Sequence, residues 1–276
     1  TAVPTVNPTV VPTGSPTVTP TVVPTVVPTG SPTVTPTVVP TSIALPEGSS
    51  WPVVTSAAGW SARAYHLSVV FDNRMWVMGG YNGGSRYNDV WSSSDGATWT
   101  EVTSAAAWSP RYYLTGVVYD NRMWVMGGDG GAYRNDVWSS SDGVTWTEVT
   151  PAASWSTRLL HATVVYGGLM WIIGGYDGNN RNDVWSSSDG ATWTQVNSAA
   201  VWTARRGHST VVYDNQMWVM GGHIGSFGND VWSSSDGVTW IQATSAAPWT
   251  TRNQHVSVVH DNRMWVIGGY DGAYYN

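Results

Sequence analysis

From residue 60 onward, the chain repeats one pattern of apolar and polar positions. Short runs rich in Val, Met and Trp alternate with turns of Asp, Asn and Gly, and no segment has a helical period. Runs of this kind, bounded by these turn residues, are typical of β-hairpins. Each copy of the pattern therefore predicts four short strands. In the first complete copy they are HLSVVF (66–71), RMWVMGG (74–80), NDVWSSS (88–94) and TWTEVT (98–103), with turns at Asp72-Asn73 and Asp95-Gly96.

Tryptophan shows the repeat most clearly, because all 19 tryptophans fall into four series with a spacing of 47 or 48 residues. The strands predicted in this way number nineteen: one at Trp51, four sets of four, and two at the end of the chain. The series are Trp51, Trp99, Trp146, Trp193 and Trp240; Trp60, Trp108, Trp155, Trp202 and Trp249; Trp76, Trp124, Trp171, Trp218 and Trp265; and Trp91, Trp138, Trp185 and Trp232.

The repeat resembles the kelch motif over residues 51–276. A Gly-Gly pair ends the second predicted strand of every copy, NDVW and TW follow it in the four complete copies, and the period matches that of kelch-type blades. The resemblance implies an all-β fold, a kelch-type β-propeller of about five four-stranded blades, with the first strand of each motif near the axis and the fourth outside. The pairs are Gly79-Gly80, Gly127-Gly128, Gly174-Gly175, Gly221-Gly222 and Gly268-Gly269.

The two ends of the repeat bear on ring closure. Trp51 belongs to a predicted outer strand that precedes the first complete blade, as in propellers that combine both termini in one blade. Asn276 matches the first residue of NDVW, so the last blade is incomplete in this chain. Five blades lie within the known range for propellers. Kelch propellers more often have six or seven, so a longer array is an open alternative.

Residues 1–41 follow a different rule, with Pro at every fourth position and Thr after each Pro. Proline fixes φ, disfavours helix in the residue before it, and removes hydrogen-bond donors from a sheet. We therefore expect an extended, polyproline-II-like tail, which at about 3.1 Å per residue would reach roughly 130 Å. The predicted domains are a Pro-Thr-x-x stalk (1–41), a linker (42–50) and the propeller (51–276).

Threonine-rich segments with proline are typical of O-glycosylated stalks. The tail resembles the Pro/Thr repeats of extracellular, hydroxyproline-rich glycoproteins, which implies covalent O-linked glycans; no other cofactor is expected. An unmodified flexible linker is the alternative. The expected sites are Thr5, Thr9, Thr13, Thr17, Thr21, Thr25, Thr29, Thr33, Thr37 and Thr41, with Pro4, Pro8, Pro12, Pro16, Pro20, Pro24, Pro28, Pro32, Pro36 and Pro40 as further sites when hydroxylated.

Charge and composition exclude several classes of function. The net charge is −6 and all 12 basic residues are arginine, so nothing suggests a surface that follows nucleic-acid phosphates. The chain has no cysteine, which excludes disulfides, thiolate metal sites and thiol nucleophiles. No apolar run approaches the length of a membrane span. An extracellular or cell-surface location is the expectation.

Four histidines, His66, His161, His208 and His255, share one repeat position, three residues after an arginine. They could converge on a metal only if that position lined the channel, and a structural role is the favoured interpretation. Galactose oxidase is a kelch-fold enzyme, but its copper site needs a tyrosine crosslinked to cysteine, which this chain cannot supply. We therefore expect no metal site, no catalytic residue and no enzymatic activity.

Sequence variation among the copies concentrates in two loops, one after Gly-Gly and one before the first strand of each blade. In a four-stranded up-and-down blade both loops emerge on the same face, and they are rich in Tyr, Arg, Asn and Gly, which suit adaptable contacts. Simple drift of loops is the alternative. The predicted partner-binding face comprises Tyr65, Arg86, Tyr87, Tyr112, Tyr113, Tyr133, Arg134, Arg181, Arg206 and Tyr274.

Two functions fit these features. The first is an extracellular structural glycoprotein, a propeller head on a glycan-coated rod, within a filament, sheath or matrix. Its partners would be copies of itself, other matrix components or glycans. The second is a secreted binding module, lectin-like or adhesive, that recognises a glycan or protein and uses the tail as a spacer.

Overall fold

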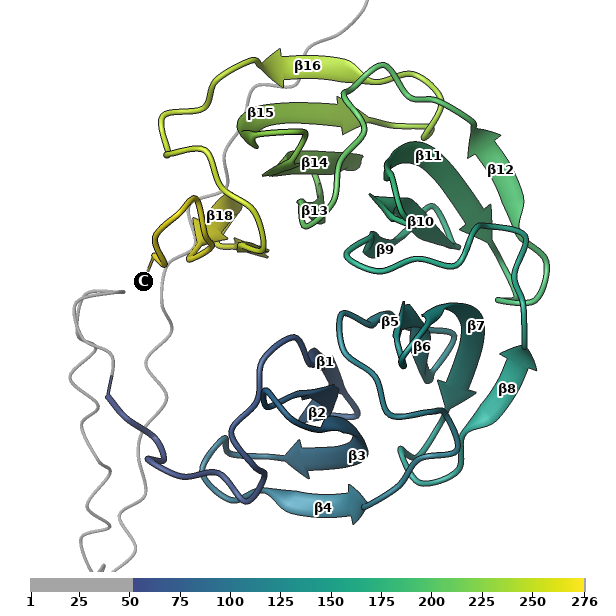
Figure 1. Ribbon diagram of the computed structural model, residues 1–276, viewed down its shortest axis with the longest axis vertical. Helices are drawn as coiled ribbons and strands as arrows, with labels where there is room; N and C mark the ends of the chain where they lie inside the picture. Colours follow the sequence, from purple (N-terminus) through teal and green to yellow (C-terminus); the bar gives the residue numbers. More distant parts are fainter. Residues whose placement is uncertain (1–51, 276) are drawn as a thin grey trace, which may run out of the picture. The chain divides into compact units, whose positions relative to one another are not determined.

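The computed structural model describes residues 52–275, and all of the described strands belong to five antiparallel sheets arranged around a common centre (Figure 1). No helix occurs in this range, and thus none that could cross a membrane. The strands are β1 (Leu67–Phe71), β2 (Arg74–Tyr81), β3 (Arg86–Ser93), β4 (Thr100–Thr103), β5 (Thr115–Tyr119), β6 (Arg122–Asp129), β7 (Tyr133–Ser140), β8 (Thr147–Thr150), β9 (Ala162–Tyr166), β10 (Leu169–Tyr176), β11 (Asn180–Ser187), β12 (Thr194–Asn197), β13 (Ser209–Tyr213), β14 (Gln216–His223), β15 (Phe227–Ser234), β16 (Ile241–Thr244), β17 (Val256–His260) and β18 (Arg263–Ile267).

Each of the first four sheets is one blade with its strands in chain order from the centre outward: β1–β4, β5–β8, β9–β12 and β13–β16 (Figure 1). The first hairpin of blade 1 turns at Asp72 and Asn73, whose φ values of 48° and 53° are those of a type I′ turn. This turn matches the twist of the strands it joins. The hairpins predicted from the Asp-Asn turns are confirmed.

The core lies between neighbouring blades, because blades 2, 3 and 4 each pack between two neighbouring sheets. One face of blade 1 presents Trp76, Met78 and Val90 to Met123 and Val125 of blade 2, and this cluster is repeated at the next two junctions. At the fourth junction the cluster is smaller and has no tryptophan that is fully buried. Burial of large apolar side chains between sheets supplies most of the favourable free energy of such a fold.

A buried arginine–aspartate pair ties the entry loop of each complete blade to its third strand. In blade 2, Arg111 donates two hydrogen bonds to the carboxylate of Asp136 at 2.6 and 2.7 Å, and a third to the carbonyl of Gly127. Burial alone raises the pKa of Asp136, but the hydrogen bonds and charge of Arg111 outweigh it and leave that pKa below its usual value. The repeated Arg and Asp are therefore structural.

The expected kelch-type β-propeller is confirmed, with four complete blades and a fifth sheet of two strands, β17 and β18. The expected N-terminal outer strand falls mostly outside the described residues, and its described part, residues 52–55, forms no strand. The predicted stalk (1–41) with its threonine and proline sites, the linker (42–50), Trp51 and Asn276 lie outside the described residues.

Candidate functional site: an uncharged pocket at the centre of the ring

The two variable loops of each blade lie together on one face of the ring, as predicted. Isolated β-bridges join the entry loop to the end of the second strand in the same blade: Ala64 pairs with Tyr81 in blade 1, and Leu159 with Tyr176 in blade 3. The same bridge occurs in the other three sheets, and two further bridges, Arg134 with Arg158 and Arg181 with Arg205, join the start of a third strand to the entry loop of the next blade. One face therefore carries the sequence differences between blades, which we call the variable face.

One repeat position on the variable face has left-handed backbone in all five sheets. It lies two residues after the repeated arginine and is occupied by Tyr65, Tyr113, Leu160, Gly207 and Gln254, whose φ values lie between 52° and 60°. This conformation costs a residue with a side chain of the order of 1–2 kcal/mol, and such residues cluster at functional sites.

Backbone hydrogen bonds from blade to blade hold these residues in place. The amide of Tyr113 donates to the carbonyl of Tyr65, that of Gly207 to Leu160, and that of Gln254 to Gly207. The side chains at this position are thereby carried around the centre of the ring on a fixed backbone.

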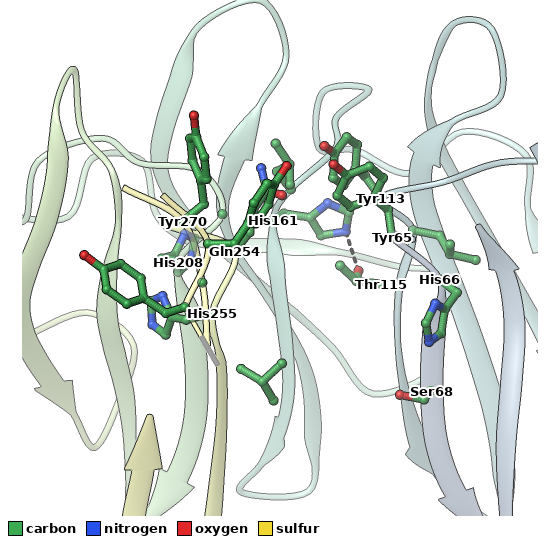
Figure 2. Close-up of a pocket in the computed structure, with 17 residues that line it drawn as sticks. Tyr65, His66, Ser68, Tyr113, Thr115, His161, His208, Gln254, His255 and Tyr270 are labelled. Carbon is green, nitrogen blue, oxygen red and sulfur yellow. Dashed lines mark hydrogen bonds between the residues drawn. The ribbon is translucent and has the colours of Figure 1, made fainter. Parts of the chain in front are cut away.

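A pocket of about 470 Å³ opens at this point (Figure 2). Its volume lies within the range of small-molecule sites. Figure 2 shows Tyr65, Tyr113 and Tyr270 at the upper end of the view, with His208 and His255 lower. The lining comes from all five sheets and comprises Tyr65, His66, Ser68, Tyr113, Leu114, Thr115, Leu160, His161, Gly207, His208, Gln254, His255, Val256, Gly269, Tyr270, Tyr274 and Tyr275.

Three of the histidines are buried beneath the pocket surface. The ring of His161 is hydrogen-bonded to the hydroxyl of Thr115 at 2.6 Å, and that of His255 to the hydroxyl of Ser209 at 2.7 Å. His208 faces Ala162 at the equivalent position, which has no hydroxyl, and neither of its ring nitrogens has a hydrogen-bond partner.

Burial holds these imidazoles neutral. It lowers the pKa of His161 to about 3 and that of His255 to about 4, with the charge of the adjacent arginine as the second cause in each. Burial likewise lowers the pKa of His208 well below its ordinary value. Because the lining has no Asp, Glu, Arg or Lys, the pocket is uncharged near neutral pH.

Part of the predicted binding face converges on this pocket. Tyr65, Tyr113 and Tyr274 line it, and the rings of Tyr65 and Tyr113 lie 4.2 Å apart between centroids. Tyr112 packs beside both, and the guanidinium of Arg86 lies 5.4 Å from the centre of its ring. Burial, and after it the neighbouring Tyr65, raises the pKa of the Tyr113 hydroxyl, so Tyr113 stays protonated.

The other predicted residues lie away from the pocket. The ring of Tyr87 covers Arg63, whose guanidinium carbon lies 4.0 Å from the ring centre, and Tyr133 packs on Tyr176. The guanidinium of Arg206 lies 4.4 Å from the centre of the Tyr176 ring and donates a hydrogen bond to Asn180 Oδ1 at 3.4 Å.

Arg181 pairs with Asp177 at 2.6 Å within one loop. The backbone of Arg134 bridges to Arg158, and its side-chain Nε is buried without a partner. These residues belong to the variable face, but their side chains do not converge on one point.

The sequence did not single out the histidines, Leu160, Gly207, Gln254, Tyr270 or Tyr275 as a site. The sequence did contain a signal, because the residue two positions after each repeated arginine differs among the copies: it is Tyr in two of them and Leu, Gly and Gln in the others. The histidine that follows was interpreted as structural, and the hydrogen bonds of His161 and His255 support that role. Within residues 52–275 no group of three or more His, Asp or Glu is arranged to hold a metal ion.

Comparisons with known proteins agree with this fold. The KLHDC2/KLHL20/DRC7 Kelch-repeats domain matches residues 144–276, and the Kelch motif matches residues 62–92. The solved structure "Structure of YjhT" aligns with a TM-score of 0.64 and 16% sequence identity, over 77% of this chain and 79% of that chain. No curated protein matches the chain in sequence. The chain contains kelch repeats and is similar to YjhT in fold.

Proposed function

We propose that the propeller is a non-catalytic, extracellular binding module that takes a neutral sugar ring of a glycan in the central pocket. The observation that carries the proposal is the composition of the pocket, which is aromatic at its rim and uncharged throughout. An uncharged pocket offers no counter-charge to an ionic ligand, whose desolvation would go uncompensated.

A sugar ring suits such a lining because it is apolar on its C–H faces and polar at its hydroxyl edges. The rings of Tyr65, Tyr113 and Tyr274 provide apolar faces and hydroxyls in one place. The amide of Gln254 adds one donor pair and one acceptor. Tyr274 is 84% exposed and Tyr65 38%, so both are available for contact before a ligand binds.

The test is binding of the full chain to an array of neutral and acidic glycans. We expect neutral glycans to be retained, and the double variant Tyr65→Gly/Tyr113→Gly to weaken retention at least tenfold. Glycine is the appropriate replacement because Gly207 occupies the same left-handed position in blade 4. The control is Val238→Ala, an exposed residue of the third-to-fourth-strand turn on the opposite face. Retention of acidic glycans alone, or equal loss in the control, would contradict the proposal.

A structural role in a filament, sheath or matrix is the second candidate, supported by the Tyr–Arg contacts that lie outside the pocket. Arg86, which is exposed, lies over Tyr112, and Arg206, which is half-buried, lies over Tyr176, so that the variable face carries cations over aromatic rings, a combination common in protein interfaces. In this role the face binds copies of the chain or another matrix component.

Sedimentation of the full chain across a range of concentrations tests this second role. We expect Arg86→Ala/Arg206→Ala to abolish concentration-dependent assembly, while glycan retention is unchanged. A chain that stays monomeric at all concentrations rules out self-assembly through this face.

A further inference from the structure

In four of the five sheets, two positions that face each other across the loop after the second strand carry matched residues. One is the first residue of this variable-face loop, and the other comes directly before the repeated Asn of the third strand. Blade 3 has an ion pair there, blade 1 and the fifth sheet have a hydrogen bond, and blade 4 has an isoleucine and a glycine, which leave no polar side chain unpaired. The pairs are Asp177–Arg181 (2.6 Å), Asn82–Tyr87 (2.5 Å), Asp271–Tyr275 (2.6 Å) and Ile224 with Gly228.

Among the five described sheets, blade 2 is the exception. Its loop begins with Gly130, and Arg134 stands where blade 3 has Arg181. A Cβ on Gly130 would lie 3.3 Å from the Nε of Arg134, so the two positions face each other as in the other blades. That Nε is buried without a hydrogen-bond partner, and the guanidinium forms no ion pair within residues 52–275. Because arginine keeps its charge, blade 2 has the cation of blade 3 without its carboxylate.

The two acids nearest to Arg134 in the sequence are engaged elsewhere. The carboxylate of Asp129 accepts a hydrogen bond from the amide of Gly131 at 2.7 Å and lies 3.6 Å from the guanidinium of Arg86. Both carboxylate oxygens of Asp136 accept hydrogen bonds from Arg111. Neither acid therefore takes the place that Asp177 has in blade 3.

Blade 3 shows which groups hold a carboxylate at this point. The Oδ2 of Asp177 accepts a hydrogen bond from the Nε of Arg181 at 2.7 Å, and its Oδ1 accepts one from the amide of Asn179 at 3.2 Å. Burial raises the pKa of Asp177, but the hydrogen bonds from Arg181, from the hydroxyl of Ser156 and from Asn179 outweigh it and leave that pKa below its usual value. The site thus combines one cation with two neutral donors.

All three donors recur in blade 2. The Oγ of Ser109 lies 3.0 Å from the point that a Cβ on Gly130 would occupy. This oxygen accepts a hydrogen bond from Arg111, so its own proton remains available to an acceptor. The donors of blade 2 are the guanidinium of Arg134, the hydroxyl of Ser109 and the amide of Ala132, which match Arg181, Ser156 and Asn179 of blade 3.

We propose that this loop of blade 2 is a receptor site for the carboxylate of an aspartate or glutamate side chain of a partner protein. The incoming carboxylate takes the place of the Asp177 carboxylate, and Arg134 turns from Gly130 to bind it as a charged pair. The space that the glycine leaves is that of one side chain, so it fits a carboxylate on a slender aliphatic stem better than one attached directly to a sugar ring. None of these residues lines the central pocket, and the site does not depend on what that pocket binds.

The test is NMR of the full chain labelled in its 12 arginines, titrated at constant ionic strength. The probes are the blocked tripeptides Gly-Asp-Gly and Gly-Asn-Gly, and sodium galacturonate. The Nε–H signal of Arg134, identified by its loss in Arg134→Gln, should shift with the Asp peptide. The Asn peptide should bind at least tenfold more weakly, since it lacks the charged hydrogen bond. No shift, or equal shifts with both peptides, overturns the proposal, and galacturonate binding as tightly as the Asp peptide overturns its assignment to a protein side chain.

Two exchanges between glycine and aspartate serve as matched variants. Gly130→Asp gives blade 2 its own carboxylate and should weaken binding of the Asp peptide at Arg134 at least tenfold. Gly130 does not have a positive φ, so the backbone accepts this change. Asp177→Gly empties the same position in blade 3 and should make the Arg181 signal respond to the Asp peptide. Unchanged binding in Gly130→Asp, or a silent Arg181 in Asp177→Gly, contradicts the proposal and leaves the pocket proposal untouched.

Discussion

Acidification should destabilise the propeller through its buried histidines well before its carboxylates titrate. The group to follow is His161, whose pKa is lowered to about 3, mainly by burial, against an ordinary value of 6.5. A group with a depressed pKa in the folded state stays neutral there while it takes up a proton in the unfolded state. Its contribution is therefore complete above pH 6.5 and is lost as the pH falls from 6.5 toward 3.

The magnitude follows from the separation of the two pKa values. A pH of 4.5 lies two units below the pKa of the imidazole in the unfolded state, and each unit corresponds to about 1.4 kcal/mol. The free energy of unfolding should therefore fall by about 2.7 kcal/mol through His161 alone. His255, with a pKa of about 4, should add about 2.5 kcal/mol by the same reasoning. The buried carboxylates, such as Asp136, have lowered pKa values and contribute losses only at still lower pH.

The assay is urea unfolding followed by tryptophan fluorescence at pH 7 and pH 4.5, for the natural chain and for His161→Leu. Leucine is the matched replacement because Leu114 occupies this position in blade 2. We expect the pH-dependent loss to shrink by about 2.7 kcal/mol in the variant, whatever its stability at pH 7. Identical losses in both proteins would refute the assignment of His161 as a buried neutral group.

Two further substitutions test individual contacts by urea unfolding at pH 7. Ala162→Ser should raise the free energy of unfolding by about 1 kcal/mol, because it offers His208 the hydroxyl that Ser209 offers the next histidine; no gain would mean that His208 is satisfied in another way. Asp136→Ala should lower it by about 3–5 kcal/mol, because Arg111, 1% exposed, would keep a buried charge without a partner, and a loss under 1 kcal/mol would contradict this.

Much of the fold could be predicted from the sequence because the information is local and repeated. The Gly-Gly pair recurs in all five copies and the Asp-Asn turn in four of them, with Gly167-Gly168 at that position in the third, so the structure predicted for one blade applies to the next. The glycines have a physical reason: a Cβ on Gly175 would lie 2.7 Å from that of His161. Side-chain identity and backbone conformation therefore point to the same structure.

The pocket could be predicted only in part, because it forms where five separate entry loops meet. Tyr65 and Tyr113 were chosen for variation and composition, and they contact each other across two blades. Gln254 and Tyr270 were not chosen, since nothing in a single repeat shows which residue of an entry loop turns toward the centre. Arg181 was chosen, but a local ion pair with Asp177 holds it, a contact that variation alone does not reveal.

The central claim, that the uncharged pocket binds a neutral sugar ring, is tested most directly by NMR of chain labelled in its 13 tyrosines. On addition of a neutral glycan retained by the array, the ring signals of Tyr65, Tyr113 and Tyr274 should shift with one common dissociation constant. Those of Tyr119 and Tyr213, whose hydroxyls bond to turns of the opposite face, should not move. Shifts confined to tyrosines outside the pocket, or none at saturating glycan, would contradict the account.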